Sequence, residues 1–260
     1  MRYALLLSAV ALVFWTFQSS AKHNITPDVN NPVVGLLGAS FVDPEASPYN
    51  TVGLTSLNGS SYRGIADYLK ALSIHNARGV VYREQAEGGA TTSGQNGFLS
   101  IQEQAERLVE HTTQWSDGTH MKVAVIFRFN DCLHTLAGLC DEQAVLDGPV
   151  ANTAQAIQYL QRQGVLVIVP SLLDYEDMDL PLVESIFSEI SPGFKVASET
   201  QYRLYKATFE SEIAAIPGVI MMDLWQGMTH IGDGLHPDHR SKRRAAKKLH
   251  KTIKHLLSVQ

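Results

Sequence analysis

The chain has 260 residues, of which 45% are hydrophobic, 8% aromatic and 18% charged, and its formal net charge is -5. This composition is typical of a globular α/β domain. The acidic balance argues against a nucleic-acid enzyme, because phosphate backbones attract basic surfaces. No internal repeat, low-complexity tract or Pro/Gly linker divides the sequence. We therefore expect one domain.

The first segment has the pattern of a secretory signal peptide. A positive charge at Arg2 precedes an apolar run from Ala4 to Phe17, and small residues follow at Ser19 to Ala21. A membrane anchor is the alternative, but the run is short against the roughly 20 residues that span a bilayer. We expect a signal peptide over residues 1–21, a single domain over residues 22–260, and a secreted or periplasmic protein.

Short, nearly continuous apolar runs alternate with segments of helical periodicity through the rest of the chain. Continuous runs are typical of strands that are buried on both faces of a parallel sheet. The alternation predicts a three-layer α/β/α sandwich around a central, mostly parallel five-stranded sheet. The expected strands are Pro32–Leu37, Gly79–Tyr82, Lys122–Phe129, Val165–Pro170 and Gly218–Met222; helical spacing occurs at Ile65, Leu69 and Leu72, and over Ile101–Val109, Ala151–Leu160 and Tyr202–Ile216.

Two later segments have unusual charge. Leu172–Gly193 is acidic and follows the fourth strand, where we expect a solvated loop, with a cover over the site as the alternative. Arg240–Lys254 is rich in Lys and Arg, contains no acid, and keeps its apolar residues at helical spacing. We expect a terminal helix packed on the sheet with a solvated basic face. The alternative is peripheral contact with an anionic membrane or another polyanion.

Three residues supply the parts of a serine hydrolase. Ser40 follows the first strand and is the expected nucleophile, on a turn before a helix. His236 precedes a proline that disfavours helical backbone, so its imidazole can act as the base from an extended loop. Asp233 is close enough in sequence to hold the second ring nitrogen of His236. The same region could bind a metal through Asp233, His236 and His239, but it lacks a clear further ligand. We expect neither a metal nor a cofactor.

Four short blocks in order resemble the SGNH, or GDSL-like, hydrolase family, whose fold is flavodoxin-like. They are Gly38-Ala39-Ser40, Gly89-Ala90-Thr91, Asn130-Asp131 and Asp233 to His236. The resemblance covers most of the mature chain, over about residues 32–257, through motifs rather than continuous similarity. It implies an oxyanion hole made by the backbone N–H groups of Ser40 and Gly89 and the side-chain amide of Asn130. It also implies hydrolysis of carboxylic esters through an acyl-enzyme.

The sequence departs from the family pattern at two positions. Ala39 stands where the family usually has an aspartate, which puts the stability of the turn in doubt more than the chemistry. Arg128 stands where a small residue is usual. Its guanidinium could pair with an acid of the protein, which we favour, or line the pocket and bind a carboxylate or phosphate of the substrate.

The substrate class stays open among the known activities of the family. Tyr62-Arg63-Gly64 and Asn130-Asp131-Cys132 are similar to stretches of the phospholipase B-like branch, which points to lipid esters. The expected substrates are lipid, lysophospholipid or small acyl esters. A carbohydrate O-acetyl esterase and an acyltransferase are alternatives of the same fold. A catalytically inactive binding protein is a further alternative, motivated by Ala39 and Arg128.

Export places both cysteines of the chain in an oxidising compartment. Cys132 and Cys140 are close in sequence, so we expect a disulfide that closes a small loop just after Asn130. Two buried thiols are the alternative. The glycosylation sequons at Asn24 and Asn58 carry meaning only in a eukaryotic secretory pathway.

Overall fold

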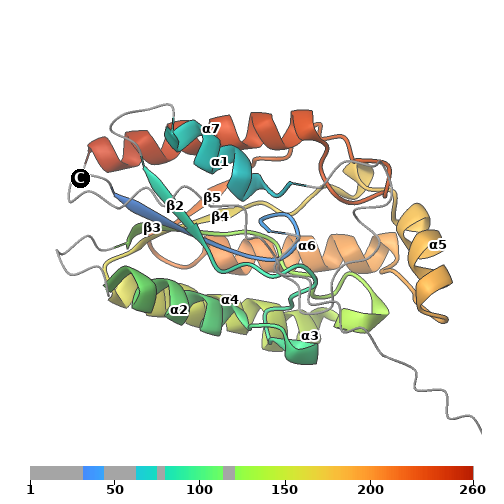
Figure 1. Ribbon diagram of the computed structural model, residues 1–260. Helices are drawn as coiled ribbons and strands as arrows, with labels where there is room; N and C mark the ends of the chain where they lie inside the picture. Colours follow the sequence, from blue (N-terminus) through green and yellow to red (C-terminus); the bar gives the residue numbers. More distant parts are fainter. Residues whose placement is uncertain (1–31, 44–62, 75–79, 114–120, 260) are drawn as a thin grey trace, which may run out of the picture.

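The computed structural model describes residues 32–43, 63–74, 80–113 and 121–259. The expected signal peptide, both sequons and Tyr62 lie outside these residues. The described part forms three layers, with a central sheet between two layers of helices (Figure 1). The expected α/β/α sandwich is confirmed.

The central sheet has five strands in the order β2-β1-β3-β4-β5, and every pairing between them is parallel. All five expected strands are present, and the apolar runs of β1, β3 and β4 lie in the core because helices cover both faces, whereas β5 at the edge is half-buried. β3 ends at Ile126 rather than at the expected Phe129, so the residues after it form a loop. The strands are β1 Val33–Leu37, β2 Val81–Glu84, β3 Met121–Ile126, β4 Leu166–Pro170 and β5 Val219–Met222.

Helices α1 and α7 lie side by side on one face of the sheet, and α2, α4 and α6 cover the other (Figure 1). The pattern of apolar residues explains this placement, since each of these helices turns an apolar stripe toward the strands. The helices are α1 Ile65–Ile74, α2 Ile101–Thr113, α3 Glu142–Val145, α4 Ala151–Arg162, α5 Leu180–Ile190, α6 Glu199–Ala214 and α7 His239–Ser258. A π-helical turn over Leu146–Val150 joins α3 to α4.

The acidic segment after β4 is not the solvated loop that we expected. Most of its second half forms α5, at one end of the sandwich (Figure 1). Asp179 caps this helix, because its Oδ1 accepts a hydrogen bond of 3.1 Å from the N–H of Leu182. Pro181 lies in the first turn, where its missing N–H costs nothing. Both signals are visible in the sequence, but the acidic residues before them suggested a solvated loop instead of a helix.

The basic C-terminal segment forms α7 as expected. Ala246, Leu249 and Ile253 are buried, and the helix packs along α1. Its Lys and Arg side chains face solvent on the other side, except for the buried Lys242, so contact with an anionic membrane stays a prediction. Within the part of the chain that the structure describes, none of the helices combines the length and apolarity that crossing a bilayer requires.

The strand order places the loops that matter at one edge. The chain runs outward from β1 to β2 and returns across β1 to β3, so neighbouring connections diverge between β1 and β3. In open parallel sheets this divergence leaves a crevice at the carboxyl ends of the strands, where ligands bind. Ser40 follows β1, and Asn130 follows β3.

Candidate active site

The turn that carries Ser40 is fixed by hydrogen bonds from three other segments. Ala39 N–H donates to the carbonyl of Arg128 (3.2 Å), and Glu87 N–H donates to the carbonyl of Gly38 (3.2 Å). Gly38 has a φ of 146°, which a residue with a side chain adopts at a cost. Ser40 does not stand directly before a helix as expected: residues 40–42 form a turn, and α1 begins at Ile65, whose N–H donates to the carbonyl of Phe41 (2.8 Å).

Ser40, His236 and Asp233 form one continuous chain of hydrogen bonds. Ser40 Oγ lies 2.7 Å from His236 Nε2, and His236 Nδ1 lies 2.6 Å from Asp233 Oδ2. With the imidazole proton on Nδ1, the ring donates to the carboxylate and accepts from the serine hydroxyl. All three side chains are buried. This arrangement can move the serine proton to the imidazole and stabilise the resulting imidazolium.

The protein stabilises the ionised form of the Asp233 carboxyl group. Burial alone would raise its pKa, but hydrogen bonds from the His236 side chain and from two backbone N–H groups outweigh burial and lower the pKa. Those N–H groups belong to Leu235 (3.0 Å) and His236 (2.9 Å), and both donate to Oδ1. The carboxylate therefore stays ionised and keeps the imidazole oriented.

The loop that carries the acid and the base is closed on itself. His230 and Pro237 form an isolated antiparallel bridge, and Ile231 N–H donates to the carbonyl of His236 (2.9 Å). Gly234 has a φ of 82° and lies so close to the carbonyl of Asp179 that a Cβ there would meet its oxygen at 2.3 Å. This turn therefore requires glycine, which explains the sequence Asp-Gly-Leu-His.

The segments with Gly89 and Asn130 are tied to each other beside the serine turn. Asn130 N–H donates to the carbonyl of Ala90 (3.0 Å), and Thr92 donates to both oxygens of Asp131 (2.8 and 2.7 Å). Within the described residues, the backbone N–H groups of Ser40 and Gly89 donate to no other group of the protein. The Asn130 amide makes one long hydrogen bond, of 3.4 Å. These three groups keep donors for a ligand.

The expected disulfide is confirmed directly behind this loop. Cys132 and Cys140 are bonded, with their Cα atoms 5.0 Å apart. Cys132 has a φ of 60°, an uncommon conformation for a residue with a side chain. The bridge closes the loop that begins two residues after Asn130, so it restrains the backbone that presents the amide.

Solved structures share this arrangement of elements over most of their length. They include a GDSL-like lipase from Bacteroides thetaiotaomicron (15% identity, TM-score 0.51, 88% of this chain and 91% of that chain). A psychrotrophic esterase from Pseudoalteromonas sp. matches with 11% identity and a TM-score of 0.52 over 88% of this chain and 100% of that chain. A carbohydrate acetylesterase from Sinorhizobium meliloti matches with 10% identity and a TM-score of 0.56 over 87% and 100% of the two chains. The chain has the SGNH hydrolase fold.

No family model and no curated protein matches the sequence, so the evidence for the SGNH fold is structural. At these identities the backbone arrangement is shared while most side chains differ. The fold that the sequence motifs implied is therefore confirmed. The roles of individual residues depend on the geometry of this chain.

Gln104 supplies support for the turn that we did not predict from the sequence. Its side chain is fully buried on α2, and its amide bonds both polar groups of the Gly38 backbone: it accepts from the N–H (2.9 Å) and donates to the carbonyl (3.2 Å). Ala39 stands where the family pattern has an aspartate, and Gln104 instead holds Gly38, the residue before it. A polar residue within the apolar stripe of a helix was the available signal.

Arg128 does not form the structural ion pair that we favoured. In the described part of the protein, none of its side-chain nitrogens has a hydrogen-bond partner, although the residue is only 8% exposed. Its guanidinium carbon lies 5.2 Å from the centroid of the Phe41 ring. The reason is local: the nearby acid, Asp131, already accepts from Thr92 through both oxygens.

His239 does not join Asp233 and His236 around a common point. It is the first residue of α7, and its Nδ1 is hydrogen-bonded to the hydroxyl of Tyr68. Among the described residues, no group of three or more His, Cys, Asp or Glu side chains is arranged to hold a metal ion.

Proposed function

We propose that this chain is a serine hydrolase that cleaves carboxylic esters through an acyl-enzyme. The observation that carries the proposal is the unbroken chain of hydrogen bonds from Ser40 through His236 to Asp233, with distances of 2.7 and 2.6 Å. These hydrogen bonds lie at the carboxyl edge of the sheet, which is where ligands bind in open parallel α/β folds. The names of the solved neighbours, a lipase, an esterase and an acetylesterase, support the same reaction class.

The reaction follows from the roles that the geometry permits. Ser40 Oγ attacks the ester carbonyl carbon while His236 Nε2 takes the hydroxyl proton. The tetrahedral intermediate then collapses: the bond to the alcohol breaks, and His236 returns the proton to the leaving oxygen. Water repeats both steps on the acyl-serine, releases the acid and restores the hydroxyl. Asp233 orients the imidazole and stabilises its charged form throughout.

The oxyanion of each intermediate requires donors that are already in place. We assign this role to the backbone N–H groups of Ser40 and Gly89 and to the Asn130 amide. Two observations support the assignment: these N–H groups make no other hydrogen bond in the described structure, and the segments that carry them are bonded together. Gly89 has a φ of 95°, and a Cβ there would meet the Phe98 ring at 2.8 Å, so only glycine presents its N–H in this way.

We further propose that the protein works outside the cytoplasm. The N-terminal pattern supports export, and the disulfide is compatible with an oxidising compartment.

The test is hydrolysis of 4-nitrophenyl esters from acetate to palmitate by the wild type and by Ser40→Ala. We expect the variant to lose at least about 10³-fold in kcat/KM. Ser258→Ala, which removes an exposed hydroxyl at the end of α7, should behave as the wild type. The chain-length profile separates a deacetylase from a lipase, and added alcohol separates transfer from hydrolysis. Equal activity of wild type and Ser40→Ala would refute the proposal.

A further inference from the structure

Arg128 has a buried charged group that its surroundings do not satisfy. A guanidinium offers five N–H donors, yet Nε and both terminal nitrogens lack a hydrogen-bond partner within the described residues. Buried arginines are normally paired, because removing an unpartnered charge from water is strongly unfavourable. A position that needed only volume would be filled better by an apolar side chain.

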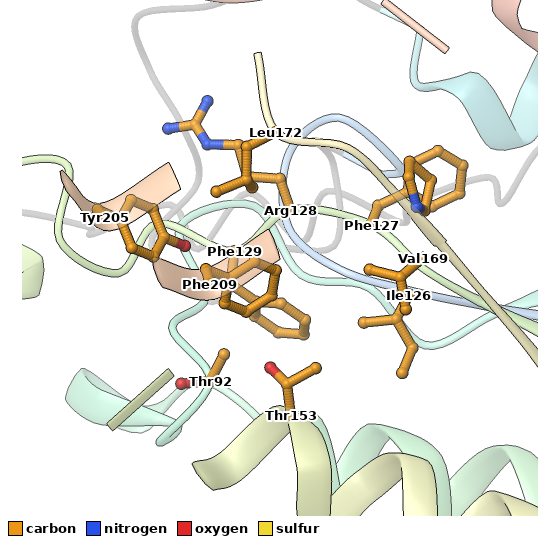
Figure 2. A pocket seen from close by; sticks show the side chains of 11 residues that line it. Thr92, Ile126, Phe127, Arg128, Phe129, Thr153, Val169, Leu172, Tyr205 and Phe209 are labelled. Atoms are coloured by element: carbon orange, nitrogen blue, oxygen red, sulfur yellow. The ribbon is translucent and has the colours of Figure 1, made fainter. Parts of the chain in front are cut away.

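The groups around Arg128 cannot supply the missing partner. Figure 2 shows the guanidinium beside Leu172, turned away from the apolar residues that line the rest of a small pocket. Asp131 attracts Arg128 at longer range, but Thr92 occupies both of its oxygens. His134 is kept neutral, because burial and the charge of Arg128 lower its pKa to about 4.

Glu210 is an acid bonded to the backbone of Leu172, and one of its oxygens is already engaged. Its Oε1 accepts from Leu172 N–H (2.7 Å) and from Lys206 Nζ (2.6 Å). Tyr202 is bonded through its hydroxyl to the carbonyl of Leu173 (2.9 Å). The Phe41 ring and the aliphatic side chain of Leu172 also lie beside the guanidinium (Figure 2) and offer it no hydrogen-bond acceptor.

The guanidinium is also a neighbour of the catalytic residues. The Arg128 carbonyl accepts from Ala39 N–H, directly before Ser40. The ring of Phe41, directly after Ser40, lies 5.2 Å from the guanidinium carbon and 5.6 Å from the centre of the His236 ring. The cation and the base therefore both lie beside the Phe41 ring, next to Ser40 in the chain.

We propose that Arg128 binds a negatively charged oxyacid group, a carboxylate or a phosphate, carried by the ester substrate. This inference rests on the proposed esterase function and narrows its substrate class to anionic esters. The planar fork of the guanidinium matches two oxygens of either group, and the buried setting strengthens the contact. The anionic group of the substrate then supplies the hydrogen-bond acceptors that the guanidinium lacks.

The test compares pairs of similar esters, one with and one without an anionic group, in two arms. For an anion in the acyl part, the pair is 4-nitrophenyl hemiglutarate and 4-nitrophenyl hexanoate. For an anion in the alcohol part, the pair is lysophosphatidate and the monoacylglycerol of the same chain. The wild type should prefer the anionic member by about tenfold or more in kcat/KM in one arm, which identifies the source of the charge.

Arg128→Gln should abolish this preference, mainly through KM, and leave kcat/KM for the neutral ester within about threefold. Arg128→Lys keeps the charge and should recover part of the preference. Arg162→Gln is the matched control, since it removes an exposed arginine at the end of α4, just before β4 and at the opposite edge of the sheet from Ser40.

Two results would overturn the inference: no preference for the anion in either arm, or an equal loss on both members of a pair in Arg128→Gln. If that variant fails to fold, competitive inhibition of the wild type by glutarate or glycerol phosphate on the neutral ester decides, with inhibition supporting the inference and its absence refuting it. Failure of the esterase proposal is distinct, because the wild type would then match Ser40→Ala on every ester.

Discussion

Gln104→Met tests whether a side chain of α2 holds the nucleophile turn. Methionine has a similar volume but no amide, so the change removes the bonds to both backbone groups of Gly38 and a weaker bond of 3.3 Å to the carbonyl of Leu99. The Gly38 N–H then stays buried without a partner, which costs about 1–3 kcal/mol, and each lost bond to a carbonyl adds about 0.5–1 kcal/mol. We expect the free energy of unfolding to fall by about 2–5 kcal/mol.

The same variant should lose about 10- to 100-fold in kcat, because a displaced turn moves Ser40 relative to His236. Urea unfolding followed by circular dichroism gives the stability, and ester hydrolysis below the unfolding transition gives kcat. Gln102→Met is the control on the same helix, since it removes only a bond to Glu106 one turn away and should change stability by under about 0.5 kcal/mol. Equal, small effects of both changes would refute the reasoning.

Three further predictions address the acid, a buried lysine and the disulfide. Asp233→Asn should lower kcat by about 10³- to 10⁴-fold at unchanged circular dichroism, because the amide cannot hold the productive imidazole tautomer; kcat close to that of the wild type would contradict this. Burial lowers the pKa of Lys242 to about 8 from 10.5, so the unfolded chain binds more protons between these values. The free energy of unfolding should therefore rise from about pH 8 to 9.5, and urea titrations of Lys242→Met should lack this rise. Reduction of Cys132–Cys140 should lower the free energy of unfolding by about 2–3 kcal/mol, whereas the double Cys→Ser variant should not respond to reductant.

The sequence predicts the sheet and the order of site segments because both depend on local patterns. The continuous apolar runs identify parallel strands, and strand ends in a parallel sheet share an edge. That edge brings Ser40 and Asn130 close. Asp233 and His236 pair within one turn, so their contact is also encoded locally.

The remaining features depend on contacts between distant segments. Gln104 bonds Gly38, which is 66 positions away in the sequence, and the helical pattern of α2 does not predict this partner. Whether Arg128 is paired depends on how Thr92 uses the oxygens of Asp131, which only the folded chain determines. The helix α5 was readable from Asp179 and Pro181, but the acidic residues before it suggested a loop.

The most direct test of the central claim is the intact mass of the protein after treatment with an alkyl fluorophosphonate. Such reagents react with activated serines, and monoethylphosphonate inhibits the esterase from Pseudoalteromonas sp. that shares this fold. We predict one phosphonyl adduct per chain, located on the peptide that contains Ser40, and none on Ser40→Ala. Labelling of Ser40→Ala equal to that of the wild type, or no labelling of a wild type that hydrolyses esters, would contradict the assignment of Ser40 as the nucleophile.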